Sequence, residues 1–567
     1  MALEEKSVRR AIKHLVTLGD TDIFPIPFEF SFYRECENDI VQRLTTLQAG
    51  SHTPTSAFEC LSPKGNLSFR IAHQLFPVDT LLYTAAVIQI APLLEALKLP
   101  SENGPFAYRF IDDDDEPRLF ARSSNFHDWL LHLKGVFLPE DAFSDAKYVL
   151  ETDISDFYAR IYFHRLEHVL DDCEAPNQVR KIIEKIIKET RARQSHGLPV
   201  GTSASRILAE ALLVDTDQML EMRSVAYSRY VDDFRIVVDH QGEVHSILCN
   251  LAEHLMLTEG LSLNANKTRT YTSNEAVDFI DAKLTDVFSD EELQRLNLYI
   301  AAVYDDEDIS VEDVDDVDPE NLISKLRDAL DPKKVDYTAI KVILKVLRAV
   351  EIENPIGFID QFIELVYHTP RDFCLLVGGL AQRHADLRDQ IANKLVSTIQ
   401  TAPFKDMSLS RIWVGHLFVT QALPITEASR VALNLTRTEI EQRQDLLLRG
   451  LLNERPFFRA QKTKFDAASE WAKPALMLGA ACLSTSEYTT WLETIKAHHS
   501  DPTSDIFRKW LKENQADVWN ALKYDYIIKT RAEKIAELFG EVEPGSILDT
   551  VLGPSVNPSG NPENPFG

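Results

Sequence analysis

Hydrophobic positions follow different periods on the two sides of one acidic stretch. Before it, short apolar runs at 147–150, 230–231 and 234–238 predict β-strands, and apolar residues three or four positions apart predict helices over 178–193 and 203–214. After it, strand-like runs are scarce and helical spacing recurs, most clearly at 339–350, 356–367, 385–398 and 437–452. The pattern predicts an α+β first half followed by an all-α second half.

The acidic stretch marks a domain border. Residues 286–320 hold 14 Asp and Glu against one basic residue, Arg295, and such a block of like charge resists burial. We therefore expect five segments along the chain. They are an N-terminal helical extension (1–100), an α+β domain (101–285), an acidic linker (286–320), a domain of stacked helical hairpins (321–542) and a disordered tail (543–567).

Composition narrows the class of protein. The 567 residues are 44% hydrophobic, which is enough for a large core, and the net charge of −28 disfavours a broad basic surface for nucleic acid. Six scattered cysteines and a charged N-terminus favour a reduced, cytoplasmic setting. The most apolar stretch, 81–94, is too short to span a membrane, and we expect a core helix that ends or kinks near Pro92.

Paired carboxylates are the strongest local signal. Tyr230-Val231-Asp232-Asp233 stands between two apolar strand signals, so it predicts a β-hairpin whose tip presents both aspartates. Adjacent carboxylates repel each other, which suggests a bound divalent cation, and Mg²⁺ prefers such oxygen ligands. The alternative is a plain solvent-exposed turn, and taken alone an Asp-Asp pair is more often that.

A second carboxylate changes this balance. Asp153 follows the strand signal at 147–150 and would lie where that strand ends. A strand-end aspartate beside a hairpin-tip aspartate is the arrangement that two-metal phosphoryl transfer requires. We expect Asp153 and Asp232 to be the main metal ligands, with Asp233 in support.

Three further segments are candidates for contacts with nucleotide or nucleic acid. The loop from His196 to Arg206 contains Gly197, Pro199 and Gly201, which allow close approach of the backbone, although an ordinary loop before a capped helix explains it too. Lys267 could neutralise a leaving pyrophosphate, or it is a surface lysine. The basic residues before the loop could bind nucleic acid or form a solvated helix face; they are Lys181, Lys185, Lys188, Arg191 and Arg193.

In their order along the chain, these pieces resemble a reverse transcriptase over roughly residues 100–285. Asp153 matches the first catalytic aspartate, and Tyr230–Asp233 matches the YxDD box of that family. The resemblance implies a right-hand polymerase with fingers and palm, a nucleotidyltransferase that uses dNTPs and two Mg²⁺ ions, for which Mn²⁺ can substitute. The metal ligands it implies are Asp153, Ile154, Asp232 and Asp233, and the nucleotide-binding residues are Tyr158 (the sugar-screening position), Gly197, Pro199, Gly201, Ser205 and Lys267.

Two departures point to a subgroup. Typical reverse transcriptases have Gln at the position of Val200 and Ser-Pro at Ser205-Arg206, whereas this loop is similar to that of the bacterial abortive-infection reverse transcriptases of the AbiK and AbiA type. That resemblance implies HEAT-like helical repeats after the polymerase, phage defence, assembly into trimers or hexamers, and template-independent DNA synthesis. It also implies single-stranded DNA that stays covalently attached to a priming hydroxyl of the protein.

Several alternatives stay open at the level of sequence. The chain could instead copy a partner RNA as a template-directed reverse transcriptase, or it could be a non-catalytic helical-repeat interaction or sensor protein. The intact set Asp153, Asp232 and Asp233 argues against the non-catalytic alternative. The priming residue is unknown: Tyr488, Tyr524 and Tyr526 have suitable hydroxyls, but tyrosines on apolar helices more often belong to a core.

Overall fold

The computed structural model describes most of the chain. The described residues are 3–48, 50–64, 67–137, 147–190, 196–285, 318–331, 333, 335–495 and 501–528. The predicted tail (543–567) and all but the last three residues of the predicted acidic linker (286–320) lie outside them. The same is true of Arg191 and Arg193.

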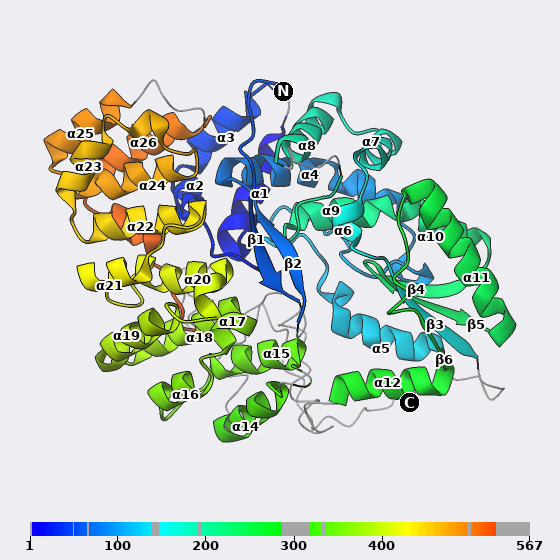
Figure 1. Cartoon of the computed structure of the whole chain (residues 1–567). Coiled ribbons are helices and arrows are strands. Elements are labelled where there is room, and N and C mark those ends of the chain that lie inside the picture. Colours follow the sequence, from blue (N-terminus) through cyan, green and yellow to red (C-terminus); the bar gives the residue numbers. More distant parts are fainter. Residues whose placement is uncertain are drawn as a thin grey trace, which may run out of the picture.

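The N-terminal region consists of helices around a two-stranded sheet (Figure 1). Its elements are α1 (Glu5–Leu18), α2 (Glu29–Glu35), α3 (Glu37–Thr45), the antiparallel pair β1 (Phe58–Pro63) and β2 (Phe69–Gln74), and α4 (Pro77–Leu97). By length and composition α4 is apolar enough to cross a membrane, and 67% of its most apolar window is buried within the protein.

Helix α4 bears on the expectation of a core helix that ends or kinks near Pro92. The helix does not end at Pro92 but continues to Leu97. Proline inside a helix costs about 3 kcal/mol because it removes a hydrogen bond and crowds the preceding turn. Here α4 packs against α1, α8 (Asn177–Thr190) and α9 (Ser203–Leu212), and this burial on several sides offsets that cost.

An antiparallel sheet of four strands forms the palm of the predicted α+β domain. Its order is β4 (Ala226–Tyr230), β5 (Asp233–Val238), β3 (Tyr148–Asp153) and β6 (Arg269–Thr272). Val149 and Val237 face a small core shared with α5 (Phe126–Phe137) and α12 (Ser273–Thr285), while Leu150 and Ile236 face the main core. Both faces are covered, which explains the continuous apolar runs of these strands.

Four more helices connect the strands of the palm. They are α6 (Phe157–Arg160), α7 (Phe163–Asp172), α10 (Val214–Met222) and α11 (Gln241–His254), of which α11 packs on β3 and β5. Helices α8 and α9 confirm the two helices predicted over 178–193 and 203–214.

Beyond residue 318 the described part of the chain is helical. It contains α14 (Pro319–Ala329), α15 (Tyr337–Leu347), α16 (Pro355–Gln361), α17 (Leu365–His368), α18 (Pro370–Arg383), α19 (Arg388–Thr398), α20 (Ser408–Val419), α21 (Glu427–Leu433), α22 (Glu439–Leu451), α23 (Arg455–Gln461), α24 (Ala472–Gly479), α25 (Thr485–Thr494) and α26 (Ser504–Glu513). The helix predicted over 356–367 is broken in two, because Phe362 leaves helical geometry (φ −111°) and buries its ring.

These helices form a stack along one side of the molecule (Figure 1). Helix α15 packs on α18, α18 on α20, α20 on α22, α22 on α24 and α24 on α26. The all-α second half is therefore confirmed for the described residues. Its assignment to HEAT-like repeats stays a prediction.

The N-terminal region joins the two halves. The indole of Trp413 on α20 donates to the carbonyl of Ile23 (2.8 Å), and that of Trp510 on α26 donates to the Glu35 carboxylate (2.7 Å). Arg443 on α22 forms a buried ion pair with Glu29 on α2. One apolar core runs through these contacts, so residues 3–76 pack on both the palm side and the helical half.

The ion pair between Glu29 and Arg443 gives a test of this junction. Glu29→Ala leaves the Arg443 guanidinium buried without its carboxylate, so we expect the free energy of unfolding to fall by about 3–5 kcal/mol. Denaturant unfolding of the full chain measures it. Arg459→Ala, which breaks the exposed pair between Arg459 and Glu487 and leaves the bond from Ser484 to Glu487 in place, is the matched control and should change little. Equal effects of the two substitutions would contradict the expected contribution of the buried pair to the free energy of unfolding.

Candidate active site

The Tyr230–Asp233 segment is a tight hairpin turn between β4 and β5. Tyr230 pairs with Asp233 in the sheet register, so Val231 and Asp232 alone form the turn, and Asp233 is the first residue of β5 and not part of the tip. Val231 has φ 57°, a left-handed conformation that is unfavourable for a β-branched residue. Surrounding contacts must therefore hold this turn in place.

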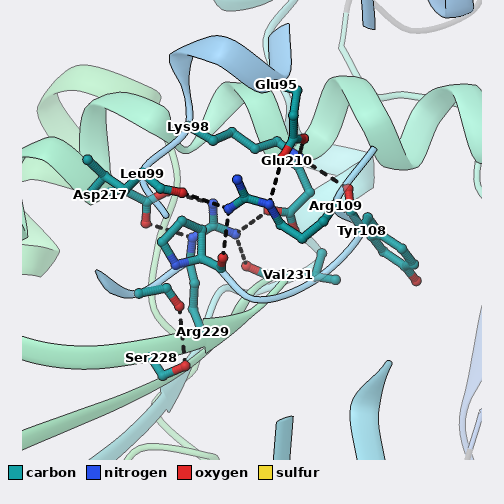
Figure 2. Close-up of polar contacts among 12 residues, drawn as sticks. Glu95, Lys98, Leu99, Tyr108, Arg109, Glu210, Asp217, Ser228, Arg229 and Val231 are labelled. Atoms are coloured by element: carbon teal, nitrogen blue, oxygen red, sulfur yellow. Dashed lines mark hydrogen bonds and ion pairs between the residues drawn. The ribbon is translucent and has the colours of Figure 1, made fainter. Parts of the chain in front are cut away.

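A buried arginine provides one of those contacts (Figure 2). The guanidinium of Arg229 donates to the carbonyl of Val231 (3.0 Å), while two other N–H groups bind both oxygens of Asp217 (2.7 Å each). It also donates to Glu210 (2.8 Å). All three charged side chains are fully buried. Burial alone would lower the pKa of Arg229, but Asp217 and Glu210 raise it above its ordinary value. The guanidinium therefore stays positively charged although it is buried.

Strand register brings the three predicted aspartates together. Asp153 is the last residue of β3 and stands directly opposite Asp233 on β5. The backbone continues the contact, because the N–H of Ile154 donates to the carbonyl of Asp232 (3.1 Å). The site combines carboxylates from two adjacent strands and the turn between β4 and β5, whereas the sequence predicts both Asp232 and Asp233 at the tip.

Crowding of these acids shows in the protonation of Asp232. Burial, and to a smaller extent the negative charges of Asp233 and Asp153, raise the pKa of Asp232 to about 7. The ammonium of Lys267 lies 2.6 Å from a carboxylate oxygen of Asp153 and neutralises it. Among the described residues, no three His, Cys, Asp or Glu side chains are placed so that together they could hold a metal ion.

The donors nevertheless fit a divalent cation. Asp153, Asp232 and Asp233 supply hard carboxylate oxygens, and Ile154 supplies a carbonyl. The pKa of Asp232 is raised mainly by burial and also by the neighbouring carboxylates, and a cation would offset both effects. Lys267, the residue predicted to contact a pyrophosphate, forms an ion pair with Asp153 in the structure without metal or substrate. Its predicted role would require it to leave that carboxylate.

A cavity of about 690 Å³ opens over the aspartates. Of the metal ligands and nucleotide-binding residues predicted from sequence, those that line it are Asp153, Ile154, Tyr158, Gly201, Asp232 and Lys267. Gly201 has φ 116°, and a Cβ there would meet Thr21 at 3.2 Å, so glycine is needed for this close approach. Burial raises the pKa of Tyr158 far above its ordinary value, so its phenol is neutral beside the site.

Other predicted nucleotide contacts lie behind the wall of the cavity. Ser205 is fully buried, its hydroxyl bonded to Thr202 (2.9 Å) and to Tyr83 (3.2 Å), because it belongs to the cap of α9. Gly197 and Pro199 are buried as well and do not line the cavity. The N–H of Gly197 donates to the carbonyl of Ile161 (2.7 Å), which ties the loop to the segment after α6.

The basic face of α8 is not part of this cavity. Lys188 pairs with Glu167 (3.2 Å), and Lys185 donates to the carbonyl of Gly50 (3.2 Å). Lys181, Lys185 and Lys188 do not line the cavity. The isoleucines on the other face of α8 are buried in the core, as expected. A role of Lys181, Lys185 and Lys188 in binding nucleic acid stays a prediction.

Sequence reasoning missed most of the cations that line the cavity. They come from the β1–β2 hairpin and α6, and are Lys64, Arg70 and Arg160; Arg206 of α9, noted from sequence only as a departure from the family pattern, lines the cavity too. Arg206 pairs with Asp22 (3.4 Å) and lies over the ring of Tyr108 (5.3 Å), both of which also line the cavity. The only signal in the sequence was a single arginine in the otherwise apolar run Phe69-Arg70-Ile71-Ala72.

The raised pKa of Asp232 leads to a prediction about metal binding. The folded protein keeps a proton on Asp232 up to about pH 7, whereas the unfolded chain loses it near pH 4, so this group's contribution to stability disappears as pH rises to 7. Mg²⁺ binds the ionised form. We therefore expect Mg²⁺ to raise the Tm more at pH 8 than at pH 6, measured by thermal unfolding.

The control for this prediction is Asp232→Asn, which carries no charge at either pH. In this variant the Tm shift caused by Mg²⁺ should be small and equal at pH 6 and pH 8. A shift that keeps its pH dependence in the variant would show that another group binds the ion.

Comparison with known proteins agrees with the geometry of the site. Residues 115–284 match the model of the reverse transcriptase (RNA-dependent DNA polymerase) family. That range contains all three aspartates, Tyr158, the glycine loop and Lys267. No curated protein sequence matches the chain.

Among solved structures, telomerases are similar at low identity. A truncated apo telomerase from Candida tropicalis is 16% identical (TM-score 0.29) over 43% of this chain and 55% of its own, so the chain spans about half of it. The telomerase from Candida albicans with a TWJ fragment of telomeric RNA is 13% identical (TM-score 0.30) over 72% and 70%. We draw no argument from these two likenesses.

The family match and the site agree on one activity. Reverse transcriptase domains use nucleotides and nucleic acid as substrates and generally require divalent metal ions, typically Mg²⁺. Residues 115–284 match the reverse transcriptase family, and this match indicates a nucleotidyltransferase activity for that domain.

Proposed function

We propose that this chain is an antiphage-defence DNA polymerase that adds dNTPs to a growing strand by two-metal phosphoryl transfer. One observation carries the polymerase part of the proposal. The register of β3 and β5 brings Asp153 beside Asp233 and Asp232, and Asp153 and Asp232 line a cavity of about 690 Å³ whose wall also holds five lysine and arginine side chains.

Each group in the cavity has a task in this reaction. Asp153, Asp232, Asp233 and the carbonyl of Ile154 would hold two Mg²⁺ ions. Such ions activate the attacking 3′ oxygen and stabilise the leaving phosphate. Lys64, Arg70, Arg160 and Arg206 are available to neutralise the triphosphate, and Lys267 the departing pyrophosphate. The ring of Tyr158 limits the space beside the sugar.

We further propose template-independent synthesis primed by a hydroxyl of the protein. Val200 supports this, because a branched apolar side chain replaces the amide of typical reverse transcriptases, and its backbone is bonded to His73 of β2 (3.1 Å). The stacked helices of the second half support the resemblance to abortive-infection enzymes, and with it a cytoplasmic trimer or hexamer in phage defence.

The priming residue is not among the candidates with buried hydroxyls. Tyr488 and Tyr526 are 1% and 0% exposed, and their hydroxyls bond to the carbonyl of Met477 (2.9 Å) and to Thr420 (2.8 Å). These two belong to the core of the helical half. Tyr524 is half-buried and lines a different cavity, so we assign no primer.

A second candidate function is template-directed reverse transcription of a partner RNA. The family that matches residues 115–284 is described as RNA-dependent DNA polymerase, and this observation favours it. The two functions differ in whether synthesis needs an added template.

Labelling separates them. The full chain receives Mg²⁺ and labelled dNTPs without a template, beside an Asp232→Ala/Asp233→Ala variant. We expect labelled product that enters the phenol phase with the protein and is released by protease. Product that appears only after RNA and a primer are added would favour the second candidate. Equal signal from the double variant would exclude the enzyme assignment and leave a non-catalytic interaction or sensor role.

Arg229 provides a test of how the hairpin is positioned. Arg229→Lys keeps the charge but cannot bind both oxygens of Asp217 and the carbonyl of Val231 at once. We expect the free energy of unfolding to fall by about 1.5–3 kcal/mol, and kcat for dNTP incorporation to fall roughly 100-fold with little change in KM, because Asp232 is misplaced. Arg459→Lys, at an exposed pair, should change neither value. A variant with reduced stability but normal kcat would show that Arg229 has a structural role only.

A further inference from the structure

We propose that a second cavity, between the β1–β2 hairpin and helix α18, binds a backbone phosphate of a single nucleic-acid strand that runs on from the polymerase cavity. The inference rests on the proposed polymerase function for the identity of the strand. This cavity has a volume of about 200 Å³. Its polar lining comes from both halves of the molecule and includes Lys64, Arg70, Lys341, Thr369 and Arg371.

The N-terminus of α18 forms one wall. Helix α18 has 14 residues and begins at Pro370, and no side chain of the described residues caps it. The helix dipole attracts anions, phosphate in particular, to the N-terminus of a helix. Thr369, Pro370, Arg371 and Asp372 all line the cavity, so this end of the helix opens into it.

A buried hydroxyl at the same place lacks a partner. The side-chain oxygen of Thr369 has no hydrogen-bond partner among the described residues, although Thr369 is only 3% exposed. Buried hydroxyls in folded proteins are nearly always hydrogen-bonded. A phosphate oxygen in the cavity would accept the proton of Thr369 and satisfy this group, so the orphan hydroxyl points to a missing acceptor ligand.

Positive charge converges on the cavity. Lys341 on α15 and Arg371 on α18 face Lys64 and Arg70 of the hairpin, against the two carboxylates Asp22 and Asp372. Burial alone would raise the pKa of Asp22, but Arg206, Arg70, Lys341 and Arg371 together lower it strongly. The Nε of Arg70 is buried without a partner in the described part of the chain. The cavity therefore keeps a surplus of cations for an anion.

The position of the cavity identifies the anion as part of a strand. Asp22, Lys64 and Arg70 line both this cavity and the polymerase cavity, so the two adjoin along the hairpin. The lining also includes the half-buried ring of Tyr337, whose hydroxyl is held by His368 (2.9 Å), and an aromatic face beside a cation is typical of single-strand binding. A free anion would need neither the adjoining cavity nor the ring.

The test measures binding of a fluorescein-labelled dT20 oligonucleotide to the full chain by anisotropy, over a range of salt concentrations. All proteins carry Asp232→Ala/Asp233→Ala, so that no synthesis occurs. Lys341→Ala/Arg371→Ala should weaken binding about tenfold at 0.1 M salt and lower the slope of log K against log salt by about 1.4, for two lost contacts with a single strand. Thr369→Val should weaken binding by a smaller factor at an unchanged slope.

Lys464→Ala/Lys509→Ala is the matched control, because it removes two exposed lysines elsewhere in the helical half. It should leave binding and slope unchanged. If it weakens dT20 as much as Lys341→Ala/Arg371→Ala does, the effect is one of net charge and the proposed site is wrong. Thermal unfolding of every variant checks that a loss of binding is not a loss of fold.

A second measurement separates a strand from a free nucleotide. Lys341→Ala/Arg371→Ala is also made with the aspartates intact, and the KM for dNTP is determined. A raised KM together with normal dT20 binding would assign the cavity to the triphosphate and overturn the strand proposal. If neither the KM nor the dT20 binding changes, the strand proposal is wrong as well. If the unmodified chain incorporates no dNTP but its dT20 binding depends on Lys341 and Arg371, the proposed polymerase function fails and the phosphate site stands.

Discussion

The buried guanidinium of Arg229 is the constraint on which the site depends. A turn of two residues with Val231 in the left-handed region is unfavourable by itself. Arg229 donates to the carbonyl of Val231 and also to the carboxylates of Asp217 and Glu210, which belong to two helices. The carbonyl of Asp232 accepts a hydrogen bond from the N–H of Ile154, directly after β3. Because both carbonyls of the turn are bonded, Asp232 is held next to Asp153 although their charges repel.

The second organising feature is the N-terminal region. It supplies Asp22 and the β1–β2 hairpin to the cavity, and it also packs against the helical half through Trp413, Trp510 and the Glu29–Arg443 pair. The hairpin is joined to the glycine loop as well, because His73 and Val200 exchange hydrogen bonds. A displacement of the helical half would therefore be transmitted directly to the wall of the nucleotide cavity.

The sequence was most informative where a residue's role depends on its immediate neighbours. Apolar runs predicted β3 and β5, and the ends of these runs placed Asp153 and Asp232 near strand ends, because strand ends follow from local pattern. The run predicted at 230–231 shares only Tyr230 with β4, whose other residues were not predicted as a strand. Lys64 and Arg70 were missed because their role depends on how a distant hairpin docks. Ser205 matched a family position, but its surroundings bury it in the cap of α9. Nothing local distinguishes Arg229, whose partners lie 12 and 19 positions away.

The contact between Lys267 and Asp153 has a consequence for how the protein exists between reactions. A cluster of three acids without a counter-ion would strain the fold whenever metal is scarce. If the aspartates hold Mg²⁺ as proposed, the ammonium of Lys267 has to leave Asp153 before the ion binds there. The apparent affinity for metal would then be lower than the intrinsic affinity by the fraction of time in which the lysine is away.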